Sequence, residues 1–182
     1  MLDAQHSWES QPNRCNPIYD TMFRYAGSRK QHYDPDTAKA AICEWLFLGQ
    51  HTGYRNLEWC QDTATTFATK FEHPDQPSIA FLAEDFVFLS ADEYITPPHL
   101  LSKLHPHTTV IMWRFQKNRN NGEEIPFHYD KSEPLFYPVA AFLHIIQGAK
   151  RLQTPADNPI AVYMTQAKTR RFLRASNITK YL

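Results

Sequence analysis

A long apolar run constrains the fold of this chain more than any other feature. The segment "DPDTAKAAICEWLFLGQ", residues 34–50, predicts a helix: Asp34 or Asp36 can cap it, and Pro35 suits a first-turn position. Gly53 can end it in a left-handed conformation. Apolar side chains cover most of the helix circumference, so other elements must surround it. These side chains are Ala38, Ala41, Ile42, Trp45, Leu46 and Leu48.

A β-hairpin is the next clear element. In "TVIMWRFQKNRNNGEEIPFHYD", residues 109–130, Val110 and Met112 alternate with Ile111 and Trp113. Asn121-Gly122 is a favoured turn pair, and "EEIPFHY" makes the return strand. Pro126 marks that return strand as an edge or bulged strand.

The remaining segments complete a mainly α fold with a small antiparallel β-sheet, an α+β class. Residues 1–33 are polar and predict an irregular arm or linker, and residues 34–182 form the domain. A second helix begins near Tyr54, and "IAFLAEDFVFLS" predicts a strand with Asp85 near its middle. A helix starts at Pro138 and ends at Gly148 or Pro155. Residues 158–182 predict a short extended piece and one or two helical turns.

Charge is balanced overall and uneven locally. Lysine and arginine number 19, as do aspartate and glutamate, so only a local basic surface can attract nucleic acid. No acidic side chain follows Asp157. The basic residues of this tail suit a solvated helix face or a DNA-binding surface; they are Lys168, Arg170, Arg171, Arg174 and Lys180.

Cysteine usage indicates a reducing, intracellular setting, the nucleus if the source is eukaryotic. The three cysteines have no paired spacing, and Cys43 is expected to be a buried thiol. No run approaches the roughly 18 apolar residues of a membrane span. The histidines lack carboxylates or cysteines at ligand spacing, and no glycine-rich nucleotide loop occurs, so we expect no metal or cofactor.

"GQHTGYRNLEWCQ", residues 49–61, holds the first candidate for phosphate chemistry. Arginine binds two non-bridging oxygens with a planar fork that stays charged. Arg55 follows a helix break and can project from a rigid scaffold, while Glu58, one helical turn on, can orient it. The same spacing also suits an ordinary i,i+3 surface ion pair.

The hairpin turn holds the second candidate. Lys117 lies where the strand enters the turn, with Arg114 and Arg119 on either side. A lysine there can reach a DNA groove and protonate a leaving oxygen. A charged turn that serves solubility explains the same residues.

Taken in order, these segments resemble the catalytic domain of tyrosine recombinases, the integrase family, and most closely the divergent crypton-like versions of eukaryotic mobile elements. "TGYRNLEW" is similar to the family's first box, with Arg55 and Glu58 at its arginine and glutamate. "VIMWRFQKNRNNGEEIPFH" resembles the hairpin that carries the catalytic lysine, here Lys117. "YPVAAFLHIIQGAKRL" resembles a helix of the divergent elements. The resemblance spans roughly residues 36–182.

The resemblance implies DNA breakage and rejoining through a phosphotyrosine, without a cofactor, by an enzyme that oligomerises on DNA. Arg55 and Lys117 would be catalytic, Glu58 supporting, and Arg114, Arg119, Lys168, Arg170, Arg171 and Arg174 DNA-binding.

Two departures from the family weaken the catalytic reading. None of the nine histidines has an arginine three residues later, so the second box is missing. Tyr181 is not assigned as the nucleophile without that box. We expect a truncated or degenerate domain that binds DNA and is inactive alone. A non-enzymatic DNA-binding or protein-interaction domain, and a domain with no nucleic-acid role, remain as alternatives.

Overall fold

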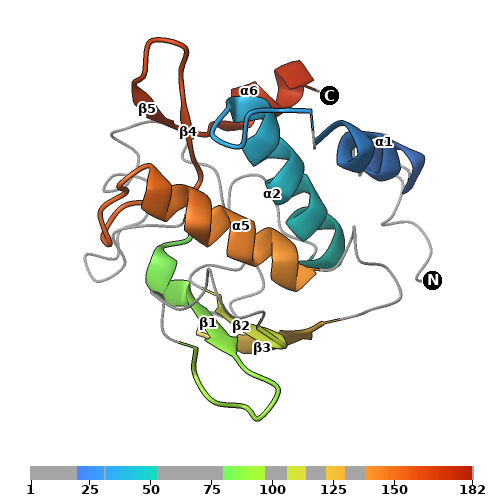
Figure 1. Cartoon of the computed structure of the whole chain (residues 1–182), viewed down its shortest axis with the longest axis vertical. Coiled ribbons are helices and arrows are strands. Elements are labelled where there is room, and N and C mark those ends of the chain that lie inside the picture. The colour runs from blue at the N-terminus through green and yellow to red at the C-terminus, as the bar shows by residue number, and fades with distance from the viewer. Residues whose placement is uncertain are drawn as a thin grey trace, which may run out of the picture.

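The computed structural model describes residues 20–30, 32–52, 80–96, 106–113, 122–129 and 138–181. In these segments four α-helices accompany a three-stranded and a two-stranded antiparallel sheet, which confirms the predicted α+β class. Helices α2 (Ala38–Thr52) and α5 (Pro138–Arg151) pack together at the centre. The larger sheet lies at one end of the molecule and the two-stranded hairpin at the other (Figure 1).

Helix α2 is the central element that its apolar run predicts. All seven residues from Ile42 to Leu48 are buried, and Cys43 and Leu48 are completely inaccessible. The helix contacts α1, α5, α6 and strand β4. A helix that is apolar on nearly all sides has partners on nearly all sides.

The start of α2 differs from the prediction. Thr37, not an aspartate, precedes the first helical residue, and its Oγ1 accepts a long hydrogen bond from the Ala40 N–H at 3.5 Å. Asp34 Oδ1 instead accepts the Asp36 N–H at 3.1 Å, which stabilises the turn before the helix. Pro35 lies in that turn and not in the first helical turn. The predicted end at Gly53 lies outside the described residues.

Helix α1 (Asp20–Lys30) forms where we predicted an irregular arm. It packs on α2 with Ala26, which is buried, and the Sγ of Cys43 lies 3.8 Å from the Ala26 carbonyl oxygen. Its other described side chains are more exposed, and Tyr25 is 62% accessible. Among the described side chains of α1 only Ala26 is buried, so they show no hydrophobic period from which a helix could be predicted.

The three-stranded sheet consists of β1 (Phe86–Leu89), β2 (Thr108–Met112) and β3 (Glu124–His128) in that order. The predicted β2–β3 hairpin is confirmed, with Pro126 opposite Val110 on an edge strand. Ile111 is buried and Met112 is partly exposed, as the alternation predicts. Pairing continues past the strands, because the Trp113 N–H donates to the Glu123 carbonyl at 2.9 Å.

Asp85 does not lie in the middle of a strand as predicted. It ends the 3-10 turn η1 (Ala83–Asp85) that precedes β1. The carboxylate is buried, and its Oδ2 accepts the Leu82 N–H at 2.7 Å. The strand starts later because this carboxylate stabilises a turn in its place.

Helix α5 starts at Pro138 as predicted but does not end at either predicted position. Gly148 lies inside the helix, and the chain turns at Gln153, which has a left-handed φ of 52°. The Thr154 N–H donates to the Ala149 carbonyl and the Gln153 N–H to the Lys150 carbonyl. These two bonds form the ending usually made with glycine at the left-handed position.

The C-terminal segment folds into a hairpin before it becomes helical. Strands β4 (Val162–Met164) and β5 (Arg170–Phe172) pair antiparallel, and α6 (Ala175–Tyr181) follows. The extended piece and short helix were predicted, whereas β5 was not. The basic residues at 168–171 therefore lie on a hairpin and not on a helix face.

Aromatic side chains form much of the core. Phe81 packs against Trp45, Phe86 and Trp113 with ring-centroid separations of 6.3, 5.4 and 6.0 Å. Phe142 of α5 is completely buried, 5.3 Å from Phe86 and 5.7 Å from Phe127. This cluster joins the two central helices to the sheet.

Candidate nucleic-acid interface

Five of the predicted site residues lie outside the described residues. Arg55 and Glu58 follow the last residue of α2, Thr52, by a few positions. Residues 114–121, which include Arg114, Lys117 and Arg119, connect Trp113 to Gly122. The roles of these five residues therefore remain predictions.

The described part of the predicted interface is the β4–β5 hairpin. The Lys168 N–H donates to the Thr165 carbonyl, and the Thr165 N–H donates to the Thr169 carbonyl, both at 2.9 Å. Lys168 itself has a φ of 57°, in the left-handed region. A turn followed by one left-handed residue is a standard three-residue hairpin loop, and that residue is usually glycine.

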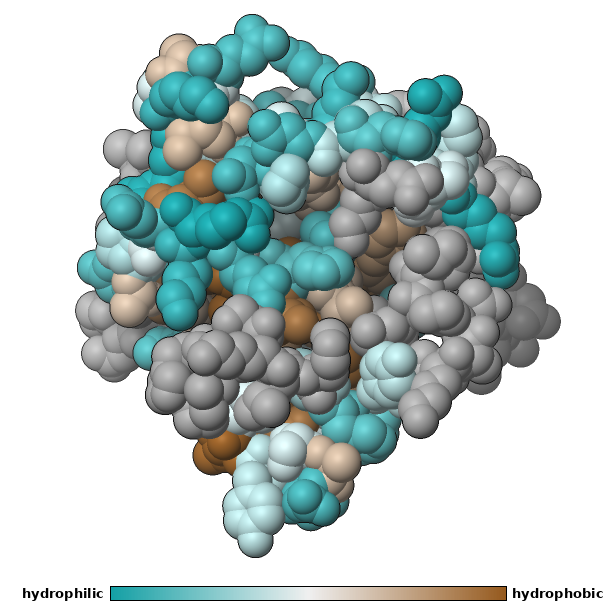
Figure 2. Space-filling model, in the orientation of Figure 1, coloured by the Kyte–Doolittle hydropathy of each residue, from teal (hydrophilic) through white to brown (hydrophobic). Residues whose placement is uncertain are grey.

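Four cations extend from this hairpin and from α6. Lys168, Arg171, Arg174 and Lys180 are exposed, and none has an ion-pair partner among the described residues. Hydrophilic residues cover the hairpin at the top of Figure 2. Because no carboxylate of the described segments neutralises them, these side chains form a locally positive surface on a chain of zero net charge.

Arg170 has a different role from its neighbour Arg171. Its Nη1 donates to the Leu152 carbonyl at 3.2 Å and also to the Gln153 carbonyl. These acceptors lie at the C-terminal end of α5, where carbonyl groups lack helical partners. Arg170 thus fastens the hairpin to α5, and its predicted contact with DNA stays a prediction.

A groove of about 720 Å³ lies between this hairpin and the turn before α2. Tyr33, Lys39, Tyr163 and Lys168 line it together with Asp34 and Asp36. The two sides come from distant parts of the sequence. They are joined by backbone contact, because the Met164 N–H donates to the Asp36 carbonyl at 2.7 Å.

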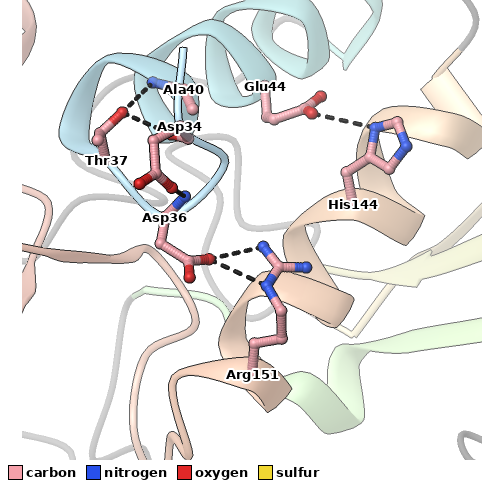
Figure 3. Close-up of polar contacts among 7 residues, drawn as sticks. All are labelled: Asp34, Asp36, Thr37, Ala40, Glu44, His144 and Arg151. Atoms are coloured by element: carbon pink, nitrogen blue, oxygen red, sulfur yellow. Dashed lines mark hydrogen bonds and ion pairs between the residues drawn. The ribbon is translucent and has the colours of Figure 1, made fainter. Parts of the chain in front are cut away.

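The acidic groups of the groove are satisfied within the protein. Asp36 Oδ1 accepts two hydrogen bonds from Arg151 of α5, from Nε at 3.0 Å and from Nη2 at 2.7 Å (Figure 3). Asp34 accepts a backbone N–H and lies beside the N-terminus of α2, which favours negative charge. Lys39 and Lys168 have no carboxylate partner among the described residues.

Tyr33 of the groove belongs to a hydroxyl network that reaches the core. Tyr181 of α6 donates to the Tyr33 hydroxyl at 3.4 Å, and the Tyr181 oxygen lies 3.3 Å from Cys43 Sγ. Burial, followed by these hydrogen bonds, raises the pKa of Tyr181 well above its ordinary value of about 10. Such a phenol is harder to ionise, which argues against Tyr181 as a nucleophile.

One polar pair was missed in the sequence. Glu44 lies within the apolar run of α2, and its Oε1 is 3.0 Å from Nδ1 of His144 on α5 (Figure 3). A carboxylate between Cys43 and Trp45 is itself a signal, because buried glutamates are nearly always paired. Among the described residues no three histidine, cysteine or acidic side chains gather as a metal site would require.

Comparisons with protein-family models, curated proteins and solved structures give no match to this chain. The resemblance to tyrosine recombinases therefore rests on its motifs alone. None of the described helices has both the length and the apolar character needed to cross a membrane.

Proposed function

We propose that this chain is a DNA-binding domain of the tyrosine-recombinase type that does not cleave DNA alone. The observation that carries the proposal is the positive surface of the β4–β5 hairpin and the start of α6. Lys168, Arg171 and Arg174 are exposed there without an ion-pair partner in the described part of the chain.

Electrostatics explains why such a surface favours DNA. Cations that contact phosphates release condensed counterions, and this release supplies most of the affinity of sequence-independent DNA binding. Arginine adds two parallel hydrogen bonds to a phosphate. Arg171 and Arg174 suit this use because their guanidinium groups are exposed.

The sheet supports a second point of DNA contact. The β2–β3 hairpin remains paired through Trp113 and Gly122, whose N–H donates to the Trp113 carbonyl at 2.6 Å. The connection that follows carries Arg114, Lys117 and Arg119. In the proposed domain Lys117 and Arg55 hold one phosphate of the DNA backbone.

Strand cleavage is not part of the proposal for this chain. A phosphotyrosyl reaction needs an ionisable tyrosine and cations that stabilise charge on phosphorus. The second histidine–arginine box does not occur in the sequence, and the pKa of Tyr181 is raised. The proposed domain therefore binds DNA without forming a covalent link.

A gel-shift titration of the full chain over a range of salt concentrations tests this function. Affinity for duplex DNA should fall steeply between about 50 and about 200 mM salt. Arg171→Ala and Arg174→Ala should each reduce the slope of log affinity against log salt by about one. Arg29→Ala, which removes an exposed arginine from α1, is the matched control and should leave the slope unchanged.

The alternative outcomes are distinct. A salt-independent affinity, or an equal loss in the Arg29→Ala control, would contradict the proposed surface. Absence of any mobility change would contradict DNA binding and leave a protein-interaction domain or another domain with no nucleic-acid role.

A further inference from the structure

We infer that the groove between residues 32–39 and the β4–β5 hairpin holds an unpaired nucleotide of a nucleic-acid strand. The inference rests on the proposed function and deepens it, because it names a single-stranded segment as part of the bound DNA. The base lies against tyrosine rings and the phosphate lies between lysines.

Size and lining fit this ligand. The groove has a volume of about 720 Å³, within the usual range of roughly 300–1,000 Å³ for small-molecule sites. Tyr33 comes from the turn before α2 and Tyr163 from β4, so aromatic rings line it from two elements. Proteins bind unpaired bases by stacking them on such rings within a positive groove.

The charges of the groove select an anion. Asp36 is neutralised by Arg151, and Asp34 accepts a backbone N–H beside the start of α2. Lys39 and Lys168 have no such partner in the described residues. With Asp36 offset by Arg151, the two lysines against the one carboxylate of Asp34 leave the groove with a small excess of positive charge, which favours a phosphodiester.

A hydrogen bond from α6 positions the Tyr33 side chain. Tyr181 donates to the Tyr33 hydroxyl, so the Tyr33 proton is available for donation to a ligand. Lys39 Nζ lies 5.6 Å from the centre of the Tyr33 ring. The turn thus offers an aromatic face, a hydroxyl donor and a cation close together.

The hairpin connects the groove to the surface proposed for duplex binding. Tyr163 is paired directly with Arg171 across the two strands, so both side chains lie on the same face. Lys168 reaches the groove from a left-handed position that a lysine rarely adopts. A strand leaving a duplex on Arg171 would pass directly into the groove.

Fluorescence anisotropy with three labelled DNAs tests the inference on the full chain. The probes are a blunt duplex, the same duplex with a short thymidine overhang, and the thymidine strand alone. One stacked base should make the overhang duplex bind about tenfold more tightly than the blunt duplex. Tyr163→Leu should remove this preference and leave blunt-duplex affinity unchanged.

Matched variants separate the groove from general effects. Tyr94→Leu removes an exposed tyrosine from the loop after β1 and should keep the preference. Lys39→Ser removes a groove cation that is not part of the proposed duplex surface and changes no core side chain, so it tests the site even if Tyr163→Leu fails to fold.

Each outcome decides a separate claim. Equal affinity for blunt and overhang duplexes, or a preference that survives both groove variants, overturns the groove and leaves the proposed duplex surface standing. Binding of the thymidine strand without binding of blunt duplex supports the groove and overturns duplex binding as the function.

Discussion

Thr109 of β2 carries a buried hydroxyl group that should lower the free energy of unfolding. The residue is fully inaccessible, and its Oγ1 has no hydrogen-bond partner in the part of the chain that the structure describes. An unsatisfied buried hydroxyl loses its water bonds without replacement. Thr109→Val keeps the shape and should raise the free energy of unfolding by about 1 kcal/mol, measured by urea denaturation.

The neighbouring threonine is the control for this prediction. Thr108 Oγ1 lies 3.0 Å from His128 Nδ1 and 3.3 Å from His107 Nδ1. Thr108→Val should therefore lower the free energy of unfolding by about 1 kcal/mol. If both variants are destabilised equally, the Thr109 hydroxyl does not lower the free energy of unfolding, and the explanation is wrong.

Gln153 is a second residue that should lower the stability of the fold, in this case through its backbone conformation. It ends α5 at a φ of 52°, which a residue with a Cβ adopts only at an energetic penalty. Gln153→Gly should raise the melting temperature by a few degrees, because glycine removes a penalty of about 1 kcal/mol. Gln153→Ala keeps the Cβ and should give no such gain; an equal rise in both variants would contradict the explanation.

At the scale of elements, the sequence predicted the helices and strands that bury many apolar side chains and missed those that bury few. The α2 segment was predictable because its apolar residues are so numerous, and β2 because its side chains alternate between buried and more exposed positions. Strand β5 has three residues, too few for a period, and its turn uses Lys168 where glycine is expected. Helix α1 buries only Ala26 among its described side chains.

Helix α6 gives an element-scale prediction about pH. The pKa of Tyr181 is raised in the folded state, so the neutral phenol stabilises the fold fully below the unfolded value of about 10. This stabilisation is lost as the pH rises above that value, because the unfolded chain then releases the proton more readily. Urea midpoints should therefore fall between about pH 9 and about pH 11.

The variant Tyr181→Phe isolates this effect. It removes the hydrogen bonds with Tyr33 and Cys43, so it should be less stable at neutral pH. It should also lose less stability at alkaline pH than the unchanged chain. An identical alkaline decline in both proteins would assign the pH dependence to other groups.

At the scale of the whole molecule, only part of the candidate site could be predicted from the sequence. The basic residues of the C-terminal segment stood out because no acidic residue follows Asp157. The groove did not, because Tyr33 and Tyr163 are far apart in sequence and meet only when β4 joins the turn before α2. Arg170 could not be told from Arg171, since only the fold directs one toward the end of α5.

An NMR titration of the full chain with a blunt DNA duplex tests the central claim most directly. The account predicts chemical-shift changes at the backbone amides of residues 165–174, with the side chains of Arg171 and Arg174 most affected. Amides on the exposed face of β1, such as Val87, should not change. Changes confined to that sheet, or a hairpin that does not respond to DNA, would contradict the account.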